Sequence, residues 1–187
     1  MRKLLCDVYK FKGVCLVAFA LICTICGAQA QESKSDKSHY MSFTALTRAG
    51  SAIATQGNRF SMIDVEASFG YHFNDRWSLH IPLAASTGLF YSNNSFREQP
   101  YLGLSAEYKV VNRDNWNLAI VPKVQSTLGS RWGAMAYDLG LNYQVEKSVI
   151  VGLGVRYLDT YKSPAATTIP NKCCVYATIG FRLNSPK

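Results

Sequence analysis

The chain has 187 residues, a length that suits one domain, and its 20 basic and 12 acidic residues give a formal charge of +8. The basic residues are spread along the chain rather than clustered, which argues against a nucleic-acid-binding surface. Six cysteines could build a disulfide framework, but four of them lie within the first 30 residues.

Those first 30 residues have the pattern of an export signal. Four basic residues precede an apolar run over 13–26, and Ala28-Gln29-Ala30 supplies the small-x-small pattern of a signal-peptidase site. An uncleaved anchor is the alternative, but the run is shorter than the roughly 20 residues that a membrane-spanning helix needs. A lipoprotein signal is disfavoured because Ile22 and Ile25 precede Cys23 and Cys26. We predict a signal peptide over 1–30.

Removal of this segment changes the balance of charge and cysteine. It takes away four basic residues and Asp7, which lowers the formal charge from +8 to +5, and it leaves only Cys173 and Cys174. Adjacent Cα atoms lie about 3.8 Å apart, too close for an ordinary disulfide, so we expect two free thiols on opposite sides of a strand. The remaining positive charge suits contact with anionic lipid headgroups.

Residues 31–38 are polar and lack apolar periodicity, which predicts a short periplasmic lead-in before one domain over 39–187. Within that domain the segment 61–73 alternates throughout. Ile63, Val65 and Phe69 fall on one side, and Asp64 and Glu66 on the other. Such a period of two is typical of a β-strand with one apolar and one polar face.

Eight segments of this kind follow one another, and we expect an all-β, eight-stranded, antiparallel up-and-down transmembrane β-barrel. The predicted strands lie over or around 39–52, 61–73, 77–91, 102–110, 116–128, 135–145, 149–157 and 175–183. Short turns are predicted at 74–76, 112–115 and 146–148, and longer loops at 92–99, 129–133 and 159–171.

The connections predict an orientation. Short turns follow the even-numbered strands, and in outer-membrane barrels such turns face the periplasm while longer loops face outward. Aromatic residues gather beside the turns, as in a headgroup-level girdle. The predicted inner ring is Tyr71, Phe73, Trp77, Tyr108, Trp116 and Tyr143, and the outer ring is Tyr91, Trp132, Tyr137 and Tyr157.

The rival architecture is a soluble periplasmic sandwich or lipocalin-like barrel, which would turn its apolar face inward. Pro82 and Pro122 count against any continuous strand, because proline removes a ladder donor. The membrane barrel is favoured because the polar face carries small residues that suit a narrow interior. They are Gly70, Ser86, Gly88, Gly103, Ser105, Gly140, Gly152, Gly154 and Gly180.

On these patterns the mature chain resembles the small outer-membrane barrels of Gram-negative bacteria, the OmpA-like and OmpX-like group. The final strand, with outward Val175, Ile179 and Phe181, resembles the C-terminal signal read by the barrel-assembly machinery, although it ends in Leu183 rather than an aromatic residue. The resemblance implies a location in the cell outer membrane, with lipid and lipopolysaccharide as partners.

Function is less determined than fold, because a barrel is a scaffold. An eight-stranded interior is only just wide enough for side chains, so we expect a lumen plugged by paired charges and a structural or interaction role through the outer loops, with no enzymatic activity. The predicted lumen network is Asp64, Glu66, His72, His80, Glu107, Lys109, Lys123, Asp138, Arg156 and Arg182.

Two alternatives stay open, a narrow small-solute channel and an enzyme that modifies lipid A. The enzyme would need a serine beside a histidine held by a carboxylate. Asp64 and Ser86 are expected to face each other, but neither His72 nor His80 reaches them in the predicted register. Neither a metal-ligand spacing nor a cofactor motif is present in the sequence.

One lumen contact is specific enough to predict. If 146–148 is a three-residue turn, Val145 faces Val149, and counting along both strands brings Asp138 opposite Arg156 on the inward side.

Overall fold

The computed structural model describes residues 39–52, 60–90, 99–128, 133–146, 148–162 and 173–184. The predicted signal peptide and lead-in lie outside the described residues. No helix within the described part of the chain is long and apolar enough to cross a membrane.

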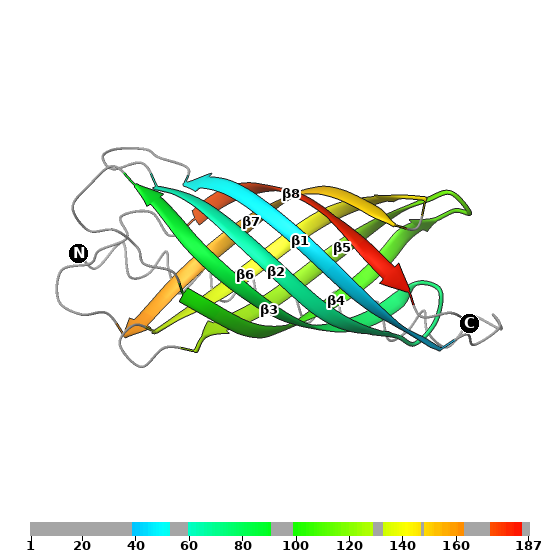
Figure 1. The fold of residues 1–187 in the computed structure, drawn as a ribbon, viewed down its shortest axis with the longest axis horizontal. Coiled ribbons are helices and arrows are strands. Elements are labelled where there is room, and N and C mark those ends of the chain that lie inside the picture. Colours follow the sequence, from blue (N-terminus) through cyan, green and yellow to red (C-terminus); the bar gives the residue numbers. More distant parts are fainter. Residues whose placement is uncertain are drawn as a thin grey trace, which may run out of the picture. The chain divides into compact units, whose positions relative to one another are not determined.

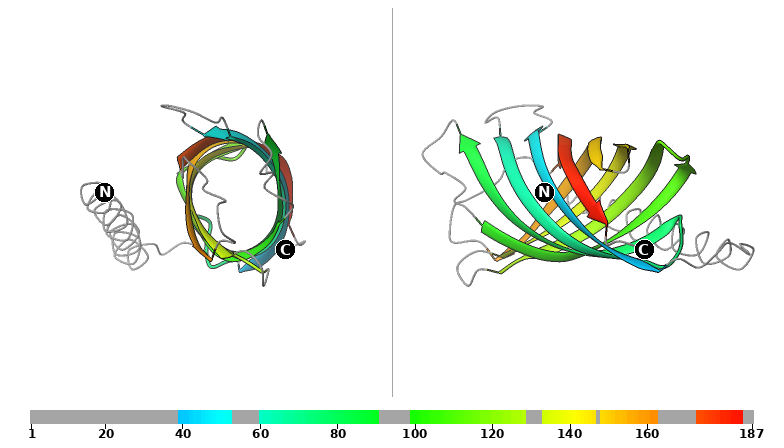
Figure 2. Two further views of the ribbon diagram at one scale, coloured as in Figure 1. Left: turned by 90° about the vertical axis from the view of Figure 1, so that its left-hand side faces the viewer. Right: turned by 45° about the vertical axis from the view of Figure 1, so that its right-hand side comes forward.

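Eight antiparallel strands form a closed barrel in which each strand pairs with the next and β8 returns to β1 (Figure 1). The predicted fold class is confirmed. The strands are β1 Tyr40–Ala52, β2 Phe60–His72, β3 Trp77–Phe90, β4 Gln99–Asn112, β5 Trp116–Thr127, β6 Gly133–Val145, β7 Val149–Lys162 and β8 Cys173–Asn184. Viewed along its axis, the barrel is a ring of strands (Figure 2).

The alternation of the sequence separates the inside of the barrel from the outside. On β2, Val65 and Phe69 are 60% and 65% exposed, while Asp64 and Glu66 are 0% and 2% exposed. The other strands follow the same rule, and Leu153 on β7 reaches 68% exposure. Apolar side chains therefore cover the outer surface, and polar and charged side chains fill much of the lumen.

Several strands are longer than the sequence pattern predicts, and β6 begins at Gly133, inside the predicted loop over 129–133. The predicted loop over 159–171 is wrong at its start, because Asp159 pairs with Met135 and the pairing continues to Gly133 opposite Lys162. The predicted loop over 92–99 likewise ends early, since Gln99 pairs with Ser86. These strand ends lack an apolar period, so backbone pairing rather than side-chain burial defines them.

Three short connections lie at one end of the barrel, which we call the turn end; the opposite end is the loop end. In the first turn, Asn74 Oδ1 accepts hydrogen bonds from the backbone N–H groups of Arg76 and Trp77, at 2.9 and 2.8 Å. In the third, Glu146 has a φ of 49°, and the N–H of Ser148 donates to the Val145 carbonyl at 3.0 Å. β1 begins and β8 ends at the turn end.

Aromatic pairs occur near both ends of the barrel. At the turn end the ring centroids of Trp77 and Tyr108 are 4.5 Å apart, and those of Trp116 and Tyr143 are 5.6 Å apart. Toward the loop end Tyr137 and Tyr157 lie 6.4 Å apart. Tyr91 and Trp132 of the predicted outer ring lie outside the described residues.

Glycines on the inward face make room for large lumen side chains. A Cβ atom at Gly70 would lie 2.3 Å from His80 Nδ1, and one at Gly154 would lie 2.4 Å from the Tyr176 ring. The His80 and Tyr176 rings thus occupy space that the side chain of any residue other than glycine at these two positions would fill. The predicted need for small residues in a narrow interior has this physical basis.

Pro82 and Pro122 both lie inside strands, and each remains paired with only one of its two neighbouring strands. Pro82 pairs with Ser68 of β2, and Pro122 pairs with Leu139 of β6. The pairing is interrupted on the other side of each proline, which in both cases is the side facing β4. The strands persist because each proline removes only one donor.

Candidate functional site

The lumen is the part of the molecule in which potentially functional side chains gather. All ten residues of the predicted network are buried there, none more than 7% exposed. Among the described residues, nine charged side chains point inward, and they come from every strand except β3: Arg48, Asp64, Glu66, Glu107, Lys109, Lys123, Asp138, Arg156 and Arg182. Arg48 is the member that the predicted network lacks.

Asp138 and Arg156 form a bidentate ion pair. Arg156 Nε donates to Asp138 Oδ1 at 2.6 Å, and its Nη2 donates to Oδ2 at 2.8 Å. The two residues are Cα partners in the β6–β7 ladder, and Val145 faces Val149 beside the turn, so the predicted register is confirmed. Arg156 Nη1 also donates to Asp64 Oδ2 at 2.6 Å, which joins β7 to β2 across the lumen.

Arg48 connects the remaining acids of this group. Its Nη1 donates to Asp138 Oδ2 at 2.7 Å and its Nη2 to Glu66 Oε2 at 2.5 Å. Lys123 Nζ bridges both oxygens of Glu66, at 2.5 and 2.7 Å. We call these six residues, Arg48, Asp64, Glu66, Lys123, Asp138 and Arg156, the central ionic cluster.

The predicted network lacks two residues of this region, and only one of them had a signal in the sequence. Arg48 falls on the face of β1 opposite to Met41, Phe43 and Ala45. Because those three residues were assigned to the outward face, Arg48 was already expected to point inward. Tyr176 had no such signal as a partner of charge. Its ring lies 5.5 Å from the Arg48 guanidinium and 6.0 Å from that of Arg156, at cation–π distance.

A second polar group lies nearer the turn end, around Arg182. Both terminal nitrogens of Arg182 donate to the Glu107 carboxylate, one of them at 2.8 Å, and its Nε donates to Thr44 Oγ1 at 3.1 Å. Gln144 accepts from Arg182 at 3.2 Å and from Asn117 at 3.0 Å. These bonds connect β8 with β1, β4 and β6.

Both lumen histidines contact serines beside this group. Ser42 Oγ lies 2.9 Å from His72 Nε2, and Ser78 Oγ lies 2.8 Å from His80 Nε2. Glu107 is 3.9 Å from that same His80 nitrogen. In a catalytic triad the carboxylate holds the nitrogen opposite the one that faces the serine. Ser78, His80 and Glu107 lack that arrangement. His39 instead contacts the Tyr71 hydroxyl at 3.2 Å at the start of β1.

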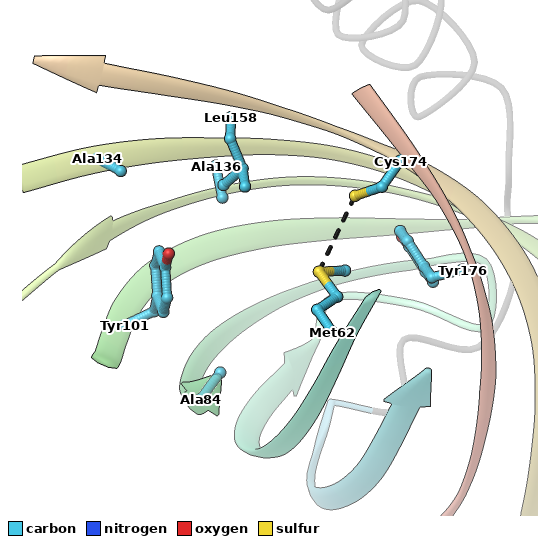
Figure 3. Close-up of a cluster of buried hydrophobic side chains, with 8 residues drawn as sticks. All are labelled: Met62, Ala84, Tyr101, Ala134, Ala136, Leu158, Cys174 and Tyr176. Atoms are coloured by element: carbon cyan, nitrogen blue, oxygen red, sulfur yellow. Dashed lines mark hydrogen bonds between the residues drawn. The ribbon is translucent and has the colours of Figure 1, made fainter. Parts of the chain in front are cut away.

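The loop end of the lumen is apolar rather than charged. A cluster of buried side chains fills it, with the Cys174 thiol 3.9 Å from the Met62 sulfur (Figure 3). Its members are Met62, Ala84, Tyr101, Ala134, Ala136, Leu158, Cys174 and Tyr176. The sequence pattern did not predict this apolar layer, because all inward-facing positions of the strands were expected to be polar or small.

A small cavity lies between the two polar groups. Its volume is about 30 Å³, and its walls include Glu66, Lys123, Ser105, Glu107 and Arg182. One water needs roughly 10–15 Å³ by this measure, so the cavity holds about two.

The two cysteines of the barrel and the possible metal ligands were the other candidates for a functional site. Cys174 is buried, Cys173 is half-buried, and both are free thiols on opposite faces of β8. Among the described residues, no three His, Cys, Asp or Glu side chains are grouped so that they could hold a metal ion.

The fold and the lumen together define a closed eight-stranded barrel with an apolar exterior and a charged, filled interior. No family model and no curated protein matches the chain. Among solved structures, the crystal structure of the outer membrane enzyme PagL is similar, with a TM-score of 0.41 and 11% identity over 74% of this chain and 99% of that chain. At this distance the likeness carries no argument about activity.

The charge balance of the central ionic cluster generates a prediction. Arg156→Met leaves three carboxylates opposite two cations and should lower the free energy of unfolding by about 3–5 kcal/mol, the usual cost of orphaning a buried charge. Adding Asp138→Asn restores the balance and should recover part of that loss. Urea titrations of vesicle-folded protein measure both, with exposed Arg76→Met as the control. A double variant no more stable than Arg156→Met would contradict the balance argument.

Proposed function

We propose that the chain is an integral outer-membrane protein of a Gram-negative bacterium, of the OmpA-like and OmpX-like kind, with a plugged lumen and a structural or interaction role through its outer loops. The observation that carries the proposal is the inverted distribution of polarity. Nine charged side chains are buried in the lumen, while 24 large hydrophobic side chains are exposed outside. A soluble barrel would carry the reverse arrangement.

A bilayer also suits the backbone of this fold. Hydrocarbon tolerates a sheet only when the sheet closes on itself, because each unpaired backbone group would cost several kcal/mol. Here β8 pairs with β1 over Ser42–Ala52, so the barrel has no free edge. The aromatic pairs at both ends are suited to the two headgroup levels.

The ends of the barrel suggest its orientation and partners. Short turns at one end suit the periplasmic side, and the connections at the loop end suit the cell surface. The four connections at the loop end follow β1, β3, β5 and β7. Each contains a basic residue in the sequence, namely Arg59, Arg97, Arg131 and Lys172. Positive charge at this level favours the phosphates of lipopolysaccharide. The apolar pattern of β8 supports recognition by the barrel-assembly machinery during insertion.

The role within the membrane follows from the filled interior. The apolar layer, the central ionic cluster and the group around Arg182 occupy successive levels of the lumen, and the cavity between the polar groups has room for about two waters. Such an interior suits a scaffold better than a pore. The outer loops are then the part of the protein available for interaction.

The membrane placement predicts a depth-dependent effect of charge on the outer surface. Ile81 and Leu183 are similarly exposed, at 56% and 59%, but Ile81 lies in the middle of β3 and Leu183 at the end of β8. Ile81→Arg should cost roughly 2–4 kcal/mol and Leu183→Arg roughly 0–1 kcal/mol. Folding titrations in lipid vesicles measure this difference. Equal costs at the two depths would count against a bilayer around the barrel.

The plug predicts that the wild-type protein adds no ion conductance to a planar bilayer. A variant with Arg48, Glu66, Asp138 and Arg156 all changed to Ala keeps the charge balance and empties the lumen, so it should conduct. It serves as the positive control for insertion and detection. Conductance steps from the wild type would favour the narrow channel instead.

We also propose that the protein is not an enzyme. The Ser42–His72 and Ser78–His80 pairs are at most 4% exposed, and Glu107 lies near the same His80 nitrogen as Ser78, an arrangement unlike a catalytic triad. Lipid A from cells with and without the protein should therefore have the same mass spectrum. A mass difference that disappears in a His80→Ala variant would establish the enzyme alternative.

A further inference from the structure

β4 is the strand whose pairing is least regular on both sides. Toward β3, the ladder is intact at His80 opposite Ser105 and again at Leu83 opposite Leu102, but the two positions between are unpaired. Pro82 lies at this break. Because proline has no N–H group, it cannot donate to the β4 backbone.

The same interruption recurs toward β5. The ladder is intact at Ser105 opposite Lys123 and again at Tyr108 opposite Ile120, and the positions between are unpaired. Pro122 lies at this second break. A register shift follows between Lys109 and Val111 of the same strand.

The other pairs of neighbouring strands are paired more regularly over the described residues. The ladders β1–β2, β2–β3, β5–β6, β7–β8 and β8–β1 run without a break, and β6–β7 has one irregularity at its end, beside Gly133. A central strand normally excludes proline, and a closed barrel has only central strands. Both prolines of the strand interiors therefore weaken the same strand.

The central ionic cluster does not brace β4. The central ionic cluster is contributed by β1, β2, β5, β6 and β7, and none of its members comes from β4. β4 reaches the lumen network through Glu107, which binds Arg182 nearer the turn end. The segment 103–107 contains both breaks, at 103–104 toward β3 and at 106–107 toward β5. Within it, Ser105 lines the central cavity and Leu104 is 49% exposed outside.

We infer that β4 is a lateral seam of the barrel, a strand that detaches locally from β3 and β5 and connects the central cavity with the outer surface. Local opening has a low free energy where backbone pairing is missing. Here the pairing toward β3 is missing at 103–104 and the pairing toward β5 is missing at 106–107, within five consecutive residues of β4. The connection to the hydrocarbon phase rests on the proposed membrane placement. The local opening itself does not.

Hydrogen exchange in detergent micelles tests the opening. Amides of 103–107 should exchange about tenfold faster than those of 151–155 in the regularly paired β7, a ratio that corresponds to about one net backbone hydrogen bond. Pro82→Ala with Pro122→Ala restores both donors and should abolish most of the difference. Pro100→Ala, at a position paired with Ala85, is the matched control and should leave it unchanged. Equal exchange in β4 and β7 of the wild type would overturn the seam.

Cysteine labelling in vesicles tests the connection to the outer surface. Ser105 and Thr178 line the same cavity and are 5% and 6% exposed, but Thr178 lies on the regularly paired β8. In a Cys173→Ser, Cys174→Ser background, a membrane-dissolved maleimide should modify Ser105→Cys and spare Thr178→Cys. Equal modification, or none at either, would overturn the connection. Fast β4 exchange in a protein that fails to enter vesicles would instead contradict the membrane placement alone.

Discussion

The rest of the structure depends on the neutral balance of charge in the central ionic cluster. Three cations and three carboxylates are buried together in a narrow lumen, where any one of them alone would be costly. Several of their bonds join strands that are not neighbours in the sheet. Arg48 connects β1 to β6, and Arg156 connects β7 to β2. The cluster therefore braces the barrel across its interior, whereas the backbone ladders act only around its wall.

Space in the lumen is the second constraint, and it explains the inward small residues. The Tyr176 ring lies beside two guanidinium groups and needs the space that Gly154 leaves. His80 needs the space at Gly70 in the same way. Large polar groups and glycines are thus paired across adjacent strands, and replacing either kind would leave a void or a clash. The filled lumen is a property of this pairing and not of any single residue.

The two constraints do not act equally on every strand. β4 contributes nothing to the central ionic cluster and faces both strand-interior prolines, so its pairing around the wall is weaker than that of its neighbours. A barrel can be rigid across its interior and still have one strand that opens at lower free energy. Stability and local mobility are then separate properties of different strands in the same sheet.

Much of the fold could be predicted from the sequence because each strand obeys a local rule. A period of two assigns every side chain to one face, and short turns set the register, so the pairing of Asp138 with Arg156 required only counting from the turn at 146–148. Where the local rule has no apolar residues to act on, as at 159–162, the strand end was misplaced.

The contacts across the lumen could not be obtained in this way. Arg48 and Asp138 are 90 residues apart, and their bond depends on the diameter and stagger of the closed barrel, to which no local pattern refers. The apolar layer around Met62 and the placement of both prolines against β4 likewise arise only when the sheet closes. The sequence by itself determined which side chains point inward. Only the tertiary structure decided which of them meet, because closure of the barrel brings together residues whose separation along the chain carries no information about their distance in space.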